Sequence, residues 1–597
     1  MDIVRSHVLV CSGTGCVVNQ ALELLQALED ELIANGIEKE VKVVRTGCHG
    51  LCELGPIVVV YPEGAFYGKV KPEDAKELVG EHLLKGRIVT RLIAQETAED
   101  GVTVKNLNET DFYLKQQRVA LRNCGIINPE VIGEYIAMDG YEALGRVLTT
   151  MSPQEVIDIV KASGLRGRGG AGFPTGLKWQ FAAAPAPVKY ICANADEGDP
   201  GAFMDRSILE GDPHVVLEAM TIAGYAIGAK QGFIYVRAEY PIAVQRLRIA
   251  IEQSKEIGLL GKNIFGTDFE FDIELRLGSG AFVCGEETAL MTSIAGKRGE
   301  PRPRPPFPAV KGLFDKPTVL NNVETYANIP PIILNGPEWF AGMGTEGSRG
   351  TKVFCLVGNI NNTGLVEVPM GITLREIVED IGGGIPNGKK FKAAQTGGPS
   401  GGCIPMEHID TPIDFETLKE IGAMMGSGGL IVMDEDSCMV DIAKFFLDFT
   451  VDESCGMCTA CRIGTKRLLE MLELITEGKG TLETLEDMDC LCHHIQTASL
   501  CALGQTAPNP VLSTLRYFHD EYLAHVVDKR CPAGVCKSLL SYFIIPEKCI
   551  GCSICAKVCP TSAISGVVKQ PYVIEQEKCV KCGVCMDKCK FSAIVKK

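Results

Sequence analysis

The sequence has no excess of basic residues. Its 59 Lys and Arg stand against 75 Asp and Glu, so the formal net charge is −16 and the pI is near 5.2. A nucleic-acid-binding protein needs cationic side chains to neutralise phosphates. This balance therefore argues against a nucleic-acid partner.

Long apolar segments are also missing. No apolar run reaches the roughly 18 residues that a membrane-spanning helix needs. The N-terminal stretch MDIVRSHVLVCSGTGC contains a short apolar strand but neither the hydrophobic region nor the cleavage site of a signal peptide. We therefore expect a cytoplasmic protein, in which the 26 cysteines are reduced thiols and metal ligands rather than disulfides.

What the chain does have is length, apolar residues and cysteine. Its 597 residues are 46% hydrophobic, enough for about four domains of roughly 150 residues, each with its own core. Cysteine is concentrated at the C-terminal end, in two copies of one pattern offset by 30 residues.

In each copy, two, two and three residues separate four cysteines. This spacing binds [4Fe–4S] clusters, and in two-cluster ferredoxins the fourth cysteine of each run binds the other cluster. A zinc ribbon or a disulfide framework is the alternative, but zinc modules typically use two ligand pairs. We expect one cluster on Cys549, Cys552, Cys555 and Cys589, and a second on Cys579, Cys582, Cys585 and Cys559.

The two copies differ at their last position. The first ends Cys559-Pro560, as in the ferredoxin pattern, whereas the second ends Cys589-Lys590. This change removes no ligand, and we expect it to alter the surroundings of the second cluster.

Four more cysteines lie near the N-terminus. Cys11 and Cys16 follow an apolar strand, and Cys48 and Cys52 lie between two β-branched runs, with the helical segment NQALELLQALEDELIANG in between. Four thiolates at loop ends suit a [2Fe–2S] site, with structural zinc as the alternative. The pattern resembles the thioredoxin-like ferredoxin module of respiratory complex I and related enzymes, over about residues 1–85.

A glycine-rich loop, SGLRGRGGAGFPTGLKW, spans residues 163–179 and includes Arg166, Arg168 and Lys178. Glycine lets backbone N–H groups approach an anion closely, and the cationic side chains add charge. The loop does not match the P-loop pattern, and such a loop alone can be merely a tight turn.

Polar residues follow apolar segments at three further places. YICANADEGDPGAF, residues 190–203, runs from a strand into Asn, Asp and Glu, a position suited to a ligand. Glu286 and Glu287 lie at a strand-to-helix junction, and TVLNNVET supplies Asn321 and Asn322. These carboxylates could form a solvated surface, but the density of motifs argues against that.

Together these motifs closely resemble the flavin- and NADH-binding subunit of complex I, of the 51-kDa type, and of soluble NAD-linked hydrogenases, over about residues 110–525. The resemblance implies hydride exchange between NAD(H) and FMN, with the protein supplying orientation and electrostatics. It implies FMN contacts at Gly167, Arg168, Gly169, Gly170, Lys178, Asn194, Asp196, Glu197, Gly285, Glu286, Asn321 and Asn322.

The same resemblance implies a nicotinamide nucleotide site at Phe173, Phe181, Glu287, Arg304 and Phe307. The residues expected to carry the chemistry are Glu197, Glu287 and Lys178. Arg304 stands where relatives have Lys, and Asp199 where respiratory relatives have a longer Glu. These two departures leave the preference for NAD or NADP open.

Two modules follow the flavin region. The stretch from Thr351 reads as a β-rich module with one helix from Thr373 onward, and it resembles a ubiquitin-like β-grasp insert of the SLBB type; we expect Cys355 and Cys403 there to be ordinary buried thiols. The next segment is helical and contains CGMCTAC. It supplies three ligands of a [4Fe–4S] cluster, and the fourth is expected to be Cys501 rather than Cys490 or Cys492: Cys455, Cys458, Cys461 and Cys501.

A connector before the tail contains His525, Cys531 and Cys536. The plain interpretation is a helix-end His and two buried thiols, but three such residues could also bind zinc. We expect one structural zinc that fixes the direction of the tail, with Cys438 as the fourth ligand and Cys490, Cys492 or His493 as alternatives.

The expected fold is multidomain, α/β plus α. The predicted order is a thioredoxin-like [2Fe–2S] domain over 1–85, a linker over 86–110, a Rossmann-like FMN and NAD(H) domain over 111–345, a β-grasp domain over 346–433, a helical [4Fe–4S] bundle over 434–525, a connector over 526–545 and a ferredoxin-like domain over 546–597.

The combination resembles the β subunit of soluble multimeric [FeFe]-hydrogenases that couple NAD(H) and ferredoxin by electron bifurcation. No H-cluster or molybdenum/tungsten domain is visible, so a partner subunit of the hydrogenase or formate dehydrogenase type would carry the terminal chemistry. Ferredoxin and a small [2Fe–2S] subunit of the complex I 24-kDa type are the other expected partners. A plain NAD(P)H diaphorase subunit without bifurcation and a non-catalytic electron-wiring scaffold are the alternatives.

Overall fold

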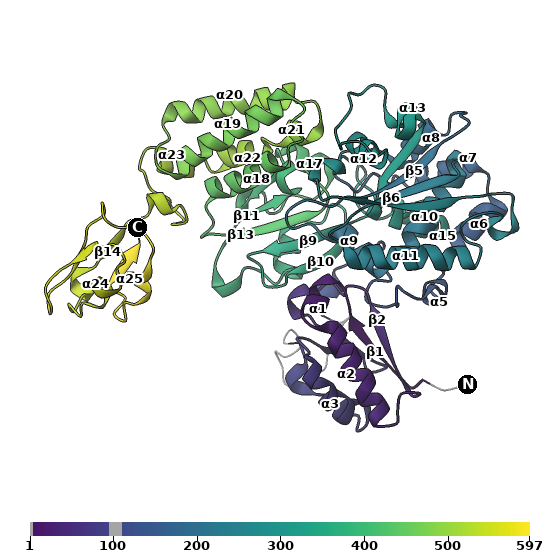
Figure 1. Ribbon diagram of the computed structural model, residues 1–597, viewed down its shortest axis with the longest axis horizontal. Coiled ribbons are helices and arrows are strands. Elements are labelled where there is room, and N and C mark those ends of the chain that lie inside the picture. The colour runs from purple at the N-terminus through teal and green to yellow at the C-terminus, as the bar shows by residue number, and fades with distance from the viewer. Residues whose placement is uncertain (1–3, 95–109, 597) are drawn as a thin grey trace. The chain divides into compact units, whose positions relative to one another are not determined.

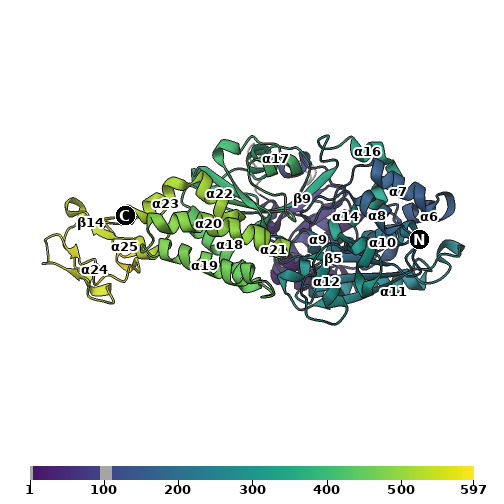
Figure 2. The same cartoon turned by 90° about the horizontal axis from the view of Figure 1, so that it is seen from above.

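The computed structural model describes residues 4–94 and 110–596. They form two compact units, divided after Val432, which Figures 1 and 2 show from two sides. The linker expected over residues 86–110 lies largely outside the described residues. None of the described helices combines the length and hydropathy needed to cross a membrane.

The first unit begins with a small α/β module. Its sheet has the order β2-β1-β3-β4, in which β1 (Ser6–Cys11) and β2 (Val41–Thr46) are parallel, while β3 (Val58–Tyr61) and β4 (Ala65–Tyr67) are antiparallel. Helix α2 (Ala21–Ala34) buries Leu24, Leu28 and Leu32 at four-residue spacing, as an amphipathic helix on a sheet should. The short helices α1 (Thr14–Val18) and α3 (Ala75–Glu77) complete the module.

A four-stranded parallel sheet forms the centre of the first unit. Its order is β7-β6-β5-β8, with β5 (Tyr190–Ala195), β6 (Gln231–Arg237), β7 (Asp272–Gly278) and β8 (Thr318–Asn322). The crossover helices are α10 (Pro213–Ile227) and α11 (Pro241–Glu256). Helix α10 begins where the Asp212 side chain accepts a hydrogen bond from Val215 N–H, and it ends at Gly228, whose φ is 76°.

The other helices around this sheet are α4 (Asp111–Leu114), α5 (Ile132–Ile136), α6 (Glu142–Thr150), α7 (Pro153–Ala162), α8 (Thr175–Ala182), α9 (Met204–Gly211), α12 (Glu287–Ile294), α13 (Pro308–Lys311), α14 (Val323–Ala327), α15 (Ile329–Asn335) and α16 (Pro337–Ala341).

A second, mixed sheet closes the first unit. Its order is β10-β9-β13-β11-β12, with β9 (Thr351–Gly358), β10 (Gly364–Pro369), β11 (Phe391–Thr396), β12 (Gly402–Pro405) and β13 (Gly429–Asp434). Helical structure follows Thr373 and is wound as a π-helix over Glu376–Ile381, and α17 (Phe415–Glu420) lies before β13. Cys355 and Cys403 are both buried.

The second unit starts as a helical bundle. Its helices are α18 (Met439–Glu453), α19 (Thr459–Thr476), α20 (Leu482–Ala498), α21 (Ala502–Thr506), α22 (Asn509–Tyr517) and α23 (His519–Val526). They bury a core that includes Leu447, Leu468, Leu472 and Ile495, and α18, α19 and α20 lie side by side in both views (Figures 1 and 2).

The tail of the second unit has its own small core around Tyr542, Ile564, Tyr572 and Ile594. Two-stranded pairs join β14 (Tyr542–Ile544) to β17 (Ile594–Lys596) and β15 (Ile564–Ser565) to β16 (Val573–Ile574). The short helices α24 (Ile554–Val558) and α25 (Val584–Asp587) each carry the third cysteine of one run.

Candidate functional site

The carboxyl ends of the four parallel strands meet at one edge of the central sheet. β8 lies beside β5, although the chain leaves β5 towards β6 and β7, so the strand order reverses between β5 and β8. Ligands of open α/β sheets bind at such a switch point. Asn194 on β5 is in register with Asn322 on β8, so these two predicted FMN contacts lie there.

The glycine-rich loop lies against this edge. A Cβ on Gly169 would meet the Cβ of Asn322 at 3.2 Å, and a Cβ on Gly170, whose φ is +115°, would meet the backbone of Gly426 at 3.2 Å. Gly167 and Gly285 have more room, with nothing nearer than 3.4 Å to such a Cβ. Without side chains, the backbone of this loop is open to close approach by an anionic group, which is what a flavin phosphate requires.

The Arg168 side chain is fully buried within the protein. Its guanidinium donates to the carbonyl oxygens of Thr351, Arg166 and Arg349, at 2.9, 2.9 and 2.6 Å. Its backbone N–H donates to Thr325 Oγ1. The arginine therefore fixes the shape of the loop through its side chain.

Several predicted FMN contacts also anchor the local backbone. Asn194 Nδ2 donates to the Gly285 carbonyl at 2.9 Å, and Asn194 Oδ1 accepts from the N–H of the buried Asp196. Glu286 caps α12 by accepting from two of its N–H groups. Asn321, with its amide oriented to satisfy its partners, accepts from Trp179 Nε1 at 3.0 Å.

Glu197 is buried and caps helix α9. Its carboxylate accepts from the backbone N–H groups of Asp205 and Arg206, at 3.1 and 3.0 Å. Burial raises the pKa of Glu197 to about 7. Asp205 in turn accepts from the Asn322 amide and from Glu324 N–H. Sequence reasoning missed Asp205, because an acidic residue within a short helix carries no motif of its own.

Asp199 lies between the central sheet and the mixed sheet. It accepts a hydrogen bond from the hydroxyl of Ser427, in the loop before β13, and burial raises its pKa to about 6. Ser427 is a second residue that sequence reasoning missed.

A charged cluster joins three of the predicted nucleotide contacts. Arg304 Nη1 lies 2.6 Å from Glu287 Oε1, and Lys178 Nζ lies 4.0 Å from Glu287 Oε2. Lys178 also donates to the Leu320 carbonyl at 3.0 Å, and burial lowers the pKa of its ammonium group. Two cations around one carboxylate suit the recognition of ribose and phosphate groups.

Three aromatic side chains near this cluster are exposed. The exposed fractions of Phe173, Phe181 and Phe307 are 46%, 56% and 57%. Phe181 is on α8 and Phe307 directly precedes α13, which packs against α8. These rings are available to stack on a planar ligand.

In the N-terminal module, four thiols converge from two loops. The thiol of Cys11 is hydrogen-bonded to those of Cys16 and Cys48, and the thiol of Cys48 also to that of Cys52. The N–H of Gly50 donates to Cys48 Sγ at 3.3 Å. The donor set, four sulfurs and no nitrogen, fits a [2Fe–2S] cluster.

This module packs closely against α9 and β10. Thr14 N–H donates to Glu210 at 2.9 Å, and Arg246 Nη2 donates to Ser12 Oγ at 2.7 Å. A Cβ on Gly47 would overlap the backbone of Gly211. The cluster-binding loops are therefore held by contacts between backbones.

In the helical bundle, the charge neighbours of the Cys461 thiol are Cys458, Cys501 and Cys455. The competitors lie apart from this group. Cys490 is exposed on α20, where its Sγ contacts His494, and Cys492 is buried in the bundle core. The structure thus brings together the four cysteines that the sequence favours.

The tail contains two cavities of about 350 and 320 Å³, each lined by four cysteines. The first is lined by Cys549, Cys552, Cys555 and Cys589, and the second by Cys559, Cys579, Cys582 and Cys585. Each cavity takes three cysteines from one run and the last from the other, which is the crossed arrangement that the sequence predicts. Because Cys589 lines the first cavity, the Cys589-Lys590 departure lies at the first site rather than at the second.

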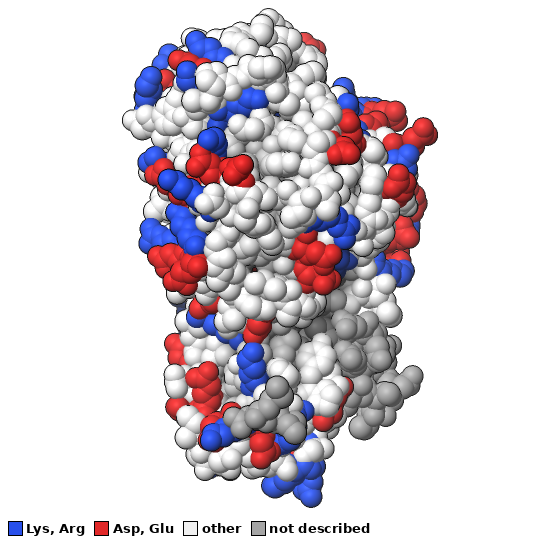
Figure 3. Space-filling view, turned by 90° about the vertical axis from the view of Figure 1, so that its right-hand side faces the viewer, with Lys and Arg blue, Asp and Glu red and all other residues white. Residues whose placement is uncertain are grey.

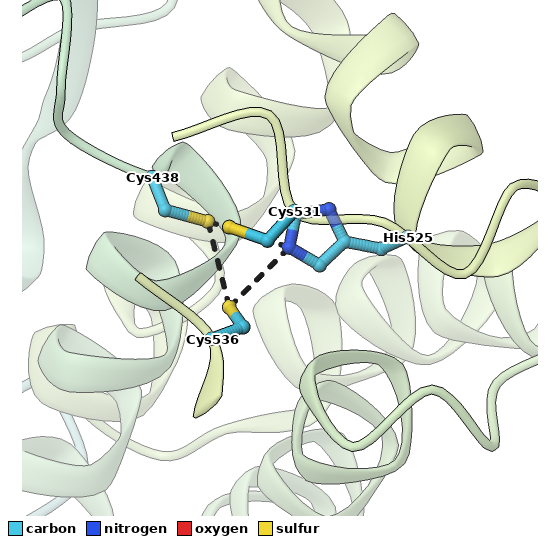
Figure 4. Close-up of side chains that lie close together, drawn as sticks. All are labelled: Cys438, His525, Cys531 and Cys536. Carbon is cyan, nitrogen blue, oxygen red and sulfur yellow. Dashed lines mark hydrogen bonds between the residues drawn. The ribbon is translucent and has the colours of Figure 1, made fainter. Parts of the chain in front are cut away.

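Four buried residues form a compact metal-binding group in the second unit: Cys438, His525, Cys531 and Cys536 (Figure 4). Their ligand atoms lie within 4.8 Å of one another. Cys438 Sγ is 3.7 Å from Cys536 Sγ, close to the edge of about 3.8 Å in a tetrahedron with Zn–S bonds of about 2.3 Å.

The histidine of this group is oriented for a metal. His525 Nδ1 is bonded to the Glu521 carbonyl at 2.7 Å, which leaves Nε2 as the ligand atom, 3.3 Å from Cys536 Sγ. The alternatives Cys490 and His493 are exposed on α20, outside this group.

Comparison with known protein families gives each module a counterpart. The chain matches the Nuo51 FMN-binding domain over residues 160–331, the NADH-ubiquinone oxidoreductase-F iron–sulfur binding region over 441–525, and the thioredoxin-like [2Fe–2S] ferredoxin over 2–82. The SLBB domain matches residues 353–404, and the 4Fe-4S binding domain matches 542–565 and 572–595.

Whole-chain relatives agree. The chain is 62% identical to the HndC component of the NADP-reducing hydrogenase of Solidesulfovibrio fructosivorans, over 77% of this chain and 93% of that protein. The chain belongs to the family of complex I 51-kDa-type flavoprotein subunits. This family member is also 45% identical to a component of the NADH-quinone oxidoreductase of Rhizobium meliloti, named F 2, over 69% of this chain and 99% of that protein.

A solved structure extends the likeness beyond the flavin module. A chain of the NAD+-reducing [NiFe]-hydrogenase in the H2-reduced state is 30% identical, with a TM-score of 0.62, and the match covers 88% of this chain and 84% of that one. The resemblance inferred from the motifs is confirmed.

Proposed function

We propose that this chain is the FMN- and iron–sulfur-containing subunit of a multi-subunit oxidoreductase that exchanges hydride with NAD(H) or NADP(H). The observation that carries the proposal is the meeting of the glycine-rich loop, Asn194, Asn322 and Glu197 at the switch point of the parallel sheet. FMN in this place would supply acceptance of a hydride and release of single electrons.

The protein's part in this chemistry is orientation and charge. The backbone at Gly167, Gly169 and Gly170 would hold the flavin phosphate, and Asn194 and Asn322 would fix the edge of the pocket. Glu197 is a buried carboxyl that can hold a proton near neutral pH. Phe173, Phe181 and Phe307 would stack on the nicotinamide nucleotide, and Lys178, Glu287 and Arg304 would bind its ribose and phosphate groups.

The cysteine groups support one [2Fe–2S] cluster in the N-terminal module and three [4Fe–4S] clusters, one in the bundle and two in the tail. We assign one Zn²⁺ to Cys438, His525, Cys531 and Cys536. Zinc has no redox chemistry, so this ion would hold the connector and take no electrons.

The assembly that fits best is a soluble hydrogenase. The names of the HndC and [NiFe]-hydrogenase relatives support a partner that carries the hydrogen chemistry, and a formate dehydrogenase partner is the alternative. A small 24-kDa-type [2Fe–2S] subunit and ferredoxin complete the proposed partners. With a flavin and several one-electron centres in one chain, we include electron bifurcation between NAD(P) and ferredoxin in the proposal.

Flavin content and dye reduction test the core of this proposal. The purified protein should contain about one FMN per chain and reduce an artificial dye with NADH or NADPH. Lys178→Ala and Glu197→Ala should lower FMN content or kcat/KM at least tenfold, whereas Lys230→Ala, on the exposed Lys230–Glu270 pair, should not. Wild-type flavin content and kinetics in both pocket variants would show that the site lies elsewhere.

A further inference from the structure

The tail differs in charge from the rest of the chain. Residues 546–597 contain nine Lys and no Arg against four Asp and Glu, although the whole chain has a net charge of −16. On the face of the molecule drawn in Figure 3, acidic and basic side chains lie in small mixed groups. The tail is therefore a basic module within an acidic protein.

The first cavity of the tail opens at an apolar rim. Cys552, one of its four cysteines, is exposed, and so are Ile550, Ile554 and Phe591 around it, by 56%, 36% and 44%. Exposed apolar side chains beside an exposed cluster ligand form a small contact surface through which a carrier protein can approach the cluster.

Lysines surround this rim. Lys548 precedes Cys549, Lys590 precedes Phe591, and the backbone N of Lys569 would be 2.6 Å from a Cβ on Gly551. All three are exposed, and among residues 4–94 and 110–596 none of them forms an ion pair. Their charges are therefore available to a partner.

The second cavity is surrounded differently. Lys578 beside it is paired with Glu575 at 2.6 Å, and Lys581 donates to the Ser538 carbonyl in the connector. Its nearby cations are thus engaged within the chain. The free positive charge of the tail lies on the side of the first cavity.

We propose that the rim of the first cavity, formed by Ile550, Ile554 and Phe591 and flanked by Lys548, Lys569 and Lys590, is the docking surface for a small acidic electron-carrier protein. The inference rests on the proposed role of the tail as an electron port and adds where the carrier binds and how it is recognised. Opposite charges at the edge of a small apolar contact raise the rate of encounter without binding the carrier tightly, which suits rapid exchange.

Charge reversal in the full-length, cofactor-loaded protein tests the location. The probe is a purified bacterial two-cluster ferredoxin of net negative charge, and its NADH-driven reduction is measured at increasing NaCl. We expect Lys548→Glu/Lys590→Glu to lower kcat/KM for ferredoxin about tenfold at low salt and to flatten its salt dependence. NADH-to-dye activity should be unchanged, because the substitutions lie outside the flavin site.

Two single variants provide the matched control. Lys590→Glu at the first cavity should lower ferredoxin reduction several-fold, and Lys578→Glu, the same charge change at the second cavity, should not. Equal losses, a loss confined to Lys578→Glu, or no salt dependence in the wild type would overturn the inference. So would a change of oligomeric state in the double variant with unaltered ferredoxin kinetics, which would identify a second copy of the chain as the occupant.

The failure of this inference is distinguishable from failure of the proposed function. If deletion of the tail abolishes ferredoxin reduction but the lysine variants do not affect it, the port stands and the docking surface is wrong. If the tail-deleted protein reduces ferredoxin normally, the port itself is wrong.

Discussion

At the N-terminal module Cys11 and Cys16 are buried and the cluster loops pack on α9 and β10, whereas in the tail Cys552 and Cys582 are exposed and no more than a small core supports them. Solvent exposure and nearby charge are among the features that set the potential and accessibility of an iron–sulfur cluster. The buried site suits exchange within the chain, and the exposed sites suit exchange with a second protein.

Removing the tail gives the strongest test of this contrast. Deletion of residues 546–597 should abolish ferredoxin exchange, by more than about 100-fold, because the exposed clusters are its only proposed port. NADH-to-dye activity should stay within about twofold of wild type. Stopped-flow reduction of ferredoxin and of dye measures both, and undiminished ferredoxin exchange would contradict the division of roles.

The zinc group lies next to the exposed tail but is itself buried. Cys531→Ser removes one of four ligands, so zinc content should fall from about one ion per chain to well below half, with iron content unchanged. Elemental analysis checks this directly. Buried Cys492→Ser, outside the group, is the control; loss of iron instead of zinc in Cys531→Ser would refute the assignment.

A chelator compares the two ends of the chain directly. Under mild oxidation with a ferrous chelator present, the tail clusters should lose iron at least about tenfold faster than the N-terminal [2Fe–2S] cluster, because their ligands are exposed. Electron paramagnetic resonance of the dithionite-reduced protein distinguishes the two cluster types during the reaction. Simultaneous loss of both signals would remove the contrast.

The packing of the N-terminal module can be weakened by one methyl group. Gly47→Ala places a Cβ against the Gly211 backbone and should cost about 1–3 kcal/mol of stability, the range for overpacking. Gly15→Ala, where nothing lies within 4 Å of the added Cβ, is the control. Thermal unfolding with the [2Fe–2S] signal as the probe should show a lower Tm for Gly47→Ala alone.

The smallest expected effect is a pH dependence confined to the first unit. Burial raises the pKa of Glu197 to about 7, above that of an unfolded Glu, so the folded state holds more protons between about pH 4.5 and 7. Stability should therefore fall as pH rises through 7, by about 1–3 kcal/mol. Glu197→Gln should flatten the Tm profile and tail deletion should not; an unchanged slope in Glu197→Gln would exclude this carboxyl as the cause.

The sequence predicts the cluster sites better than the flavin pocket, for a physical reason. Cysteine spacing acts over a few residues, so it indicates the crossed cavities of the tail and the partners of Cys461 without a three-dimensional structure. The zinc group was harder, because Cys438 is far from His525 in sequence and only the packing of α18 with α23 joins them.

The flavin pocket depends on contacts between distant segments. The glycine-rich motif does not tell that the Arg168 guanidinium turns inward to three carbonyls, nor that Asp205 holds the Asn322 amide. Ser427 reaches Asp199 from a loop 228 residues away. Such partners have no local pattern and become visible only when the sheets are assembled.

The glycine contacts between modules also limit how this chain could exchange parts with its relatives. Gly47 faces Gly211 and Gly364 faces Gly50, so each pair has one member on the N-terminal module and one on the rest of the unit. A chimera that takes its [2Fe–2S] domain from another protein would have to keep all four glycines, since a side chain at either member of a pair prevents the backbones from meeting. These four positions therefore provide a simple compatibility test for recombined or grafted N-terminal domains, independent of how similar the rest of the donor sequence is.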